Sequence, residues 1–73
     1  MKECEKRAIE KAIELAEKQV NENRYNDYIP EGKLNSKIAY RAVRIAELRA
    51  KRCYDFRTRQ EAFEYALNLL NQN

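Results

Sequence analysis

Residues 37–52 read KIAYRAVRIAELRAKR and combine helical apolar spacing with concentrated positive charge. At about 100° per residue their apolar side chains fall on one arc, which predicts an amphipathic helix over residues 36–54. Several of these side chains are alanine, so a neighbouring helix can approach closely. The arc contains Ile38, Ala39, Ala42, Val43, Ile45, Ala46, Ala50 and Cys53. We expect Asn35 or Ser36 to cap this helix.

Two further helices are expected on either side of this segment. Residues 2–23 have an apolar face opposite a mixed-charge face, and residues 59–71 follow TRQE, in which Thr58 and Glu61 have capping-box spacing. The single glycine and the single proline lie together in YIPEGKLN and mark the break before the central helix. The sequence therefore predicts an all-α fold, a small three-helix domain over residues 1–73 with one longer loop between the first two helices.

The length of the chain limits how it can be stabilised. A domain of 73 residues buries only about 60% of the surface of its unfolded chain, so it needs additional stabilisation. Metal is not expected, because the chain has no histidine and only two cysteines. We expect Cys4 and Cys53 to be free thiols in a cytoplasmic protein, with a single disulfide between them left open. Helix packing and self-association remain, so a homodimer is one expected assembly.

The N-terminal residues lack the apolar core of a signal peptide, and no segment approaches the ~20 apolar residues of a membrane span. We therefore expect no membrane partner. The loop between the first two helices contains Tyr25 and Tyr28, together with Ile29 and Leu34. Two interpretations stay open for them: they fold back as core anchors, or the tyrosines stay exposed as binding aromatics.

Positive charge is unevenly distributed along the chain. Residues 1–32 contain 6 basic and 8 acidic side chains, residues 33–59 contain 9 and 2, and residues 60–73 contain only 2 acidic ones. The net charge of +3 therefore conceals a strongly basic middle. We expect most of these cations to project from one face of the central helix, around Leu48, with Arg49 apart from them on the apolar side. The predicted partner-binding residues are Lys37, Arg41, Arg44, Leu48, Lys51, Arg52, Arg57 and Arg59.

Three interpretations of this basic face are possible. It is a solvated face, or one neutralised by glutamates of the first helix; it binds nucleic-acid phosphates; or it docks on an acidic protein surface. Our first choice is a non-catalytic module that engages nucleic acid with little sequence specificity. The alternative is a protein-docking inhibitor or adaptor. A standard helix-turn-helix is disfavoured, because the third helix carries Glu61 and Glu64 and no basic residue after Arg59.

The sequence does not indicate an enzyme. Histidine, the usual general base near neutral pH, is absent, and a single glycine excludes the glycine-rich phosphate loops. The carboxylates form no pair set apart in an apolar stretch, and the position of Cys53 on the apolar arc indicates a packing role. We therefore expect no catalytic residues and no cofactor.

Overall fold

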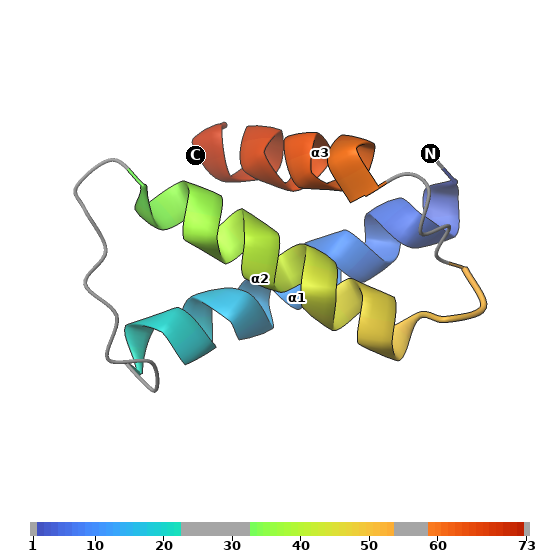
Figure 1. Ribbon diagram of the computed structural model, residues 1–73, viewed down its shortest axis with the longest axis horizontal. Helices are drawn as coiled ribbons and strands as arrows, with labels where there is room; N and C mark the ends of the chain where they lie inside the picture. The colour runs from blue at the N-terminus through green and yellow to red at the C-terminus, as the bar shows by residue number, and fades with distance from the viewer. Residues whose placement is uncertain (1, 23–32, 54–58, 73) are drawn as a thin grey trace.

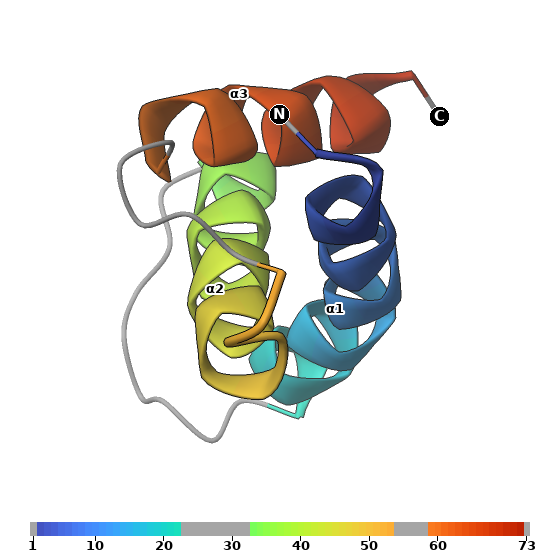
Figure 2. The same cartoon turned by 90° about the vertical axis from the view of Figure 1, so that its right-hand side faces the viewer.

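The computed structural model describes residues 2–22, 33–53 and 59–72. Within these ranges the chain forms three helices and no strand: α1 (Glu3–Asn21), α2 (Leu34–Arg49) and α3 (Arg59–Asn71). The predicted all-α, three-helix fold is confirmed. Helices α1 and α2 cross each other, and α3 lies across both (Figures 1 and 2). The predicted loop with Tyr25, Tyr28 and Ile29 lies outside the described residues, and the homodimer stays a prediction.

The central helix ends earlier than the sequence predicts. It stops at Arg49 instead of residue 54, because Ala50 leaves the helical region with φ −115° and ψ 46°. The N–H of Ala50 still donates to the carbonyl oxygen of Ala46 at 2.8 Å. The N–H of Cys53 then donates to the carbonyl oxygen of Ala50 at 2.9 Å. These bonds close a turn over residues 50–53. Lys51 and Arg52 therefore lie on this turn and not on the helix face where we expected them.

The start of α2 also differs from the prediction. The residue at its N-cap is Lys33, which caps without a side-chain hydrogen bond, so neither Asn35 nor Ser36 acts as the cap. The Asn35 side chain is engaged elsewhere: its Nδ2 donates to Oδ1 of Asn71 at 3.0 Å. This bond joins the beginning of α2 to the end of α3, which explains why Asn35 is drawn into the helix.

The core is built mainly from alanine. Small side chains at the crossing points let the helix backbones approach closely, so that a short chain can still exclude water. The predicted apolar arc of α2 is confirmed as the buried side from Ile38 to Ala46. Ile9 of α1 is the large apolar side chain that is fully buried, at 0% exposure. The buried apolar residues are Ile9, Ala12, Ala16, Ile38, Ala39, Ala42, Val43, Ile45, Ala46, Ala62 and Ala66.

Polar contacts hold α3 against α1. The hydroxyl of Tyr65 donates to Oε1 of Glu10 at 2.7 Å, and Nζ of Lys6 lies 5.9 Å from the centre of the Tyr65 ring. The hydrogen bond to the Glu10 carboxylate is the main cause that raises the pKa of Tyr65 above its ordinary value, because only the protonated hydroxyl can donate. These contacts fix how α3 lies across the first two helices.

Candidate functional site

The solvent face of α2 carries part of the predicted basic surface. Arg44 is exposed, and Leu48, one turn further along, is 62% exposed. Tyr40, one turn before Arg44, is 67% exposed. These three residues follow the i, i+4, i+8 spacing that places side chains along one helix face. The expectation of an outward-facing surface around Leu48 is therefore met at this part of α2.

Three of the predicted partner-binding residues are already engaged within the fold. Nε of Arg41 donates to Oε1 of Gln19 in α1 at 2.9 Å, and the Arg41 side chain is half-buried there. Nε of Arg59 lies 2.8 Å from Oε1 of Glu47 and forms an ion pair with it. Lys37 is half-buried and also has an interaction partner. The partner of Arg41 is therefore an uncharged amide of α1, whereas the partner of Arg59 is a carboxylate of α2.

The other predicted cations lie at the end of α2. Lys51 and Arg52 are exposed on the turn over residues 50–53. This turn is held beside the first turn of α1, because Sγ of Cys4 lies 3.7 Å from the carbonyl oxygen of Cys53. The contact brings the two cations toward α1, away from the helix face on which the sequence pattern placed them. Arg57, the last of the predicted set, lies outside the described residues.

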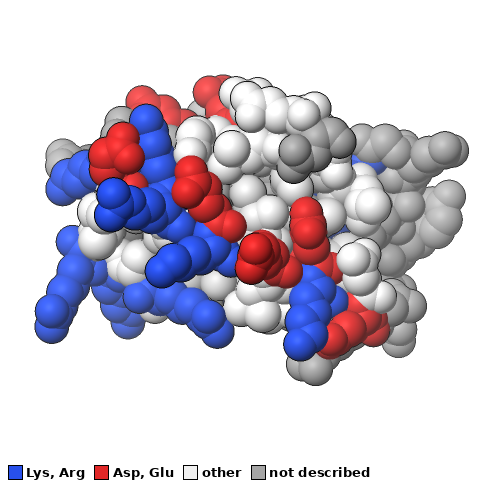
Figure 3. Space-filling view, turned by 180° about the vertical axis from the view of Figure 1, so that it is seen from behind, with Lys and Arg blue, Asp and Glu red and all other residues white. Residues whose placement is uncertain are grey.

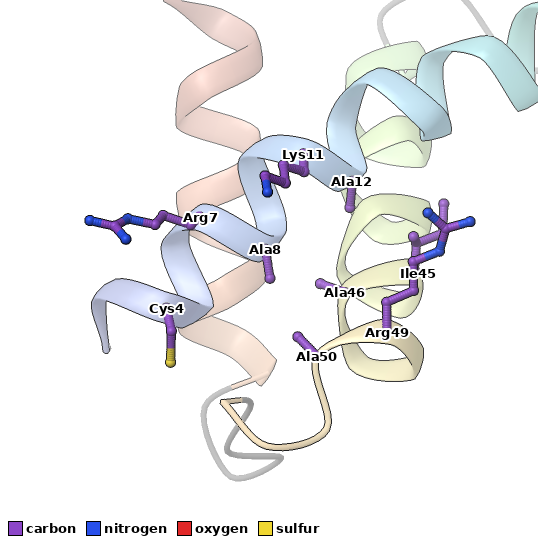
Figure 4. Close-up of a pocket in the computed structure, with 9 residues that line it drawn as sticks. All are labelled: Cys4, Arg7, Ala8, Lys11, Ala12, Ile45, Ala46, Arg49 and Ala50. Carbon is purple, nitrogen blue, oxygen red and sulfur yellow. The ribbon is translucent and has the colours of Figure 1, made fainter.

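A groove separates the first half of α1 from the last turns of α2. Its volume is about 320 Å³, and we call it the α1–α2 groove. Figure 4 shows the short side chains of Ala8, Ala46 and Ala50 turned toward the gap, while the long side chains of Arg7 and Arg49 extend outward from the helices. The residues lining the groove are Cys4, Arg7, Ala8, Lys11, Ala12, Ile45, Ala46, Arg49 and Ala50. Among the described residues, this lining contains three cations and no carboxylate.

These observations define one cationic surface, which we call the basic end: Arg7, Lys11, Arg49, Lys51 and Arg52. All five side chains are exposed. Lys and Arg side chains gather at this end of the molecule, where α1 begins and α2 finishes (left in Figure 3). No ion pair to any of these five cations is found in the described parts of the chain. We therefore take the basic end as the candidate binding surface.

Sequence reasoning did not assign Arg7, Lys11 or Arg49 to a binding surface. Residues 1–32 have a net negative charge, so counting charge by segment did not single out Arg7 and Lys11. Their i, i+4 spacing nevertheless places them on one side of a helix. The signal that could have found them is the run of small residues at Cys4, Ala8 and Ala12. That run indicates where another helix comes close, and the two cations flank it. Arg49, expected apart from the other cations on the apolar side of the central helix, extends outward (Figure 4).

A second groove lies between α2 and α3 and has a volume of about 380 Å³. It includes the Arg59–Glu47 ion pair beside the rings of Tyr40 and Phe63, with Arg44 at its edge. Because Glu47 neutralises Arg59 here, this surface offers less unpaired positive charge for phosphate contacts than the basic end does. It is better suited to a mixed polar and apolar partner.

The described residues contain no group of three or more cysteine, aspartate or glutamate side chains arranged to hold a metal ion. No helix in the described ranges has the length and apolar character needed to cross a membrane. The guanidinium and ammonium groups of the basic end can make ionic and hydrogen-bonding contacts. No protein-family model matches this chain, and no curated protein or solved structure shows significant similarity to it.

Proposed function

We propose that this chain is a non-catalytic module that binds nucleic acid through its phosphates, with little base specificity, by means of the basic end and Arg44. The observation that carries the proposal is the set of exposed cations at the basic end, contributed by two different helices and a turn, without an ion pair among the described residues. Lys and Arg that neutralise phosphates release condensed counterions, which gives affinity that does not depend on sequence.

Helix stability explains only part of this surface. A cation in the last turn of a helix interacts favourably with the helix dipole, and Arg49 occupies that position in α2. The dipole gives no comparable reason for Arg7, which is the fifth residue of α1 and lies beyond its first turn. Arg7 and Arg49 nevertheless line the same groove. A common anionic partner accounts for both positions, whereas the dipole accounts for one.

The arrangement of the helices supports binding with little base specificity. The Lys51–Arg52 turn and the sides of α1 and α2 carry the cations, and side chains on turns and helix sides suit backbone contacts. Helix α3, which would be the reading helix of a helix-turn-helix, has Glu61 in its first turn and no basic residue in its last turn. A helix of this composition would be repelled by phosphates in a major groove.

A charge reversal with a matched control tests the proposal. Lys11→Glu changes an exposed lysine of the basic end, and Lys18→Glu makes the same change at an exposed lysine near the other end of α1. Affinity for a fluorescein-labelled single-stranded oligonucleotide is measured by anisotropy at low salt, after circular dichroism has shown that both variants fold. We expect Lys11→Glu to weaken binding about tenfold and Lys18→Glu to change it much less. Equal effects would show that the basic end is not the binding site.

One observation favours a second candidate, a protein-docking inhibitor or adaptor that binds an acidic protein surface. Tyr40 and Leu48 are large exposed side chains on either side of Arg44, and aromatic and arginine residues are frequent anchors at protein interfaces. Binding of this kind would persist at high salt and would be lost on Leu48→Ser. Nucleic-acid binding would instead weaken steeply with salt and tolerate that change.

A further inference from the structure

The chain contains two cysteines, and the fold brings them together although 49 positions separate them. The Cys4 thiol donates to the carbonyl oxygen of Cys53 across 3.7 Å, and both cysteines are half-buried. The Cys4 side chain also hydrogen-bonds with the Cys53 thiol, which is the largest cause that raises the pKa of Cys53 above its ordinary value. Burial raises this pKa as well. The two sulfur atoms therefore share one site at the junction of α1 and the 50–53 turn.

We propose that Cys4 and Cys53 form a reversible intramolecular disulfide by exchange with a small-molecule disulfide of the glutathione type. Both residues lie at the ends of helical structure, where a small backbone adjustment costs little. Cys4 is in the first turn of α1, and Cys53 lies beyond the end of α2 on a turn closed by its own bond to Ala50. We therefore expect the small shift that brings the sulfurs to bonding distance to leave both helices intact.

The exchange balances in atoms and electrons. One cysteine thiolate attacks a sulfur of oxidised glutathione, which forms a mixed disulfide and releases one glutathione thiolate. The second cysteine thiolate then attacks the protein sulfur of that mixed disulfide and releases the second glutathione thiolate. Two protein thiols are oxidised to one disulfide, one glutathione disulfide is reduced to two thiols, and the two protons pass to the released glutathione.

The surroundings of the pair favour this reagent. Glutathione disulfide carries a net negative charge near neutral pH, and two cations of the basic end, Lys51 and Arg52, directly precede Cys53 in the chain. Cys4 itself lines the α1–α2 groove with Arg7, Lys11 and Arg49. The half-buried state of both sulfurs leaves them accessible to a small molecule while limiting contact with a second protein chain. This inference does not depend on the nucleic-acid role proposed above.

The product links the two elements that carry the basic end. Lys51 and Arg52 precede Cys53 directly, and Arg7 lies one turn beyond Cys4 on α1. A covalent bond between the cysteines therefore fixes the turn over residues 50–53 to α1. Because it closes a loop of most of the chain length, the bond also restricts the unfolded state strongly.

The test measures disulfide formation in glutathione buffers of graded composition. Reduced protein is equilibrated, quenched with acid and alkylated with N-ethylmaleimide, and intact mass then distinguishes the products. We expect a monomer that has lost two hydrogen atoms, with neither glutathione nor the alkylating group attached. The equilibrium constant for this product should be roughly 30-fold or more higher in buffer than in concentrated urea, because a native disulfide stabilises the fold by that factor.

Two single variants serve as controls. Cys4→Ser and Cys53→Ser each retain one thiol and should give only the mixed disulfide with glutathione. A mixed disulfide or a cross-linked dimer as the main product of the wild-type chain would overturn the proposal. So would an equilibrium constant in buffer less than roughly 30-fold above that in urea. Because these measurements use the wild-type chain, they remain decisive even where a serine variant fails to fold.

Discussion

Among the described residues, replacing Ile9 by alanine should destabilise the protein more than any other single truncation of an apolar side chain. Ile9 is 0% exposed, and its removal deletes three carbons from the tightest part of the core. Such truncations cost about 2–5 kcal/mol, depending on how far the surroundings collapse into the cavity. The buried neighbours are mostly alanine, which has no side-chain torsion with which to fill a void. We therefore expect a loss of about 3 kcal/mol or more.

This loss is large for a chain of 73 residues, whose free energy of unfolding is expected to be about 4–11 kcal/mol. Urea titration followed by circular dichroism measures it directly, and thermal unfolding should show a midpoint lower by about 12–24 °C. Ile13→Ala is the control, since Ile13 lies one turn further along α1 and is half-buried. If both variants lost the same free energy, the assignment of Ile9 to the centre of the core would be refuted.

Two further predictions concern single contacts. Tyr65→Phe should cost about 0.5–1 kcal/mol near neutral pH because it removes the hydrogen bond to Glu10. Since the folded-state pKa of Tyr65 is raised, this stabilisation is present below pH 10.0 and is lost as pH rises through that pKa; urea titrations should show the two proteins converging there. Arg41→Ala should lower the free energy of unfolding, because the Arg41 side chain is hydrogen-bonded to Gln19. Arg44→Ala should instead lower oligonucleotide affinity and leave the free energy of unfolding nearly unchanged, because Arg44 is exposed. The reverse pattern would contradict these roles.

The buried face of α2 could be predicted from the sequence alone. All of its buried residues, from Ile38 to Ala46, lie on the arc that helical spacing defines. This succeeds because α2 packs between two helices, and its apolar positions have to follow the helical period. The end of the same helix could not be predicted. Residues 50–53 contain no glycine or proline, and the contact that accompanies the turn comes from Cys4, far away in the sequence.

The candidate site was only partly accessible to sequence reasoning, for a related reason. Arg44 and Leu48 depend on their position within one helix, and the helical period placed both correctly on the exposed side. Arg7 and Lys11 join the basic end through the crossing of α1 and α2, which no local pattern encodes. Both residues belong to residues 1–32, whose net charge is negative, so counting charge along the chain indicated no basic surface there. Charge balance along a sequence and charge balance on a surface are therefore different quantities in this protein.

The salt dependence of oligonucleotide binding tests the central claim most directly, because it counts the phosphates that the protein neutralises. If all five cations of the basic end and Arg44 contact a single strand, the logarithm of the association constant should fall linearly with the logarithm of salt concentration, with a slope of about −4.2. Lys11→Glu should make that slope shallower by about 0.7 or more. A slope near zero, or no binding at low salt, would contradict the account.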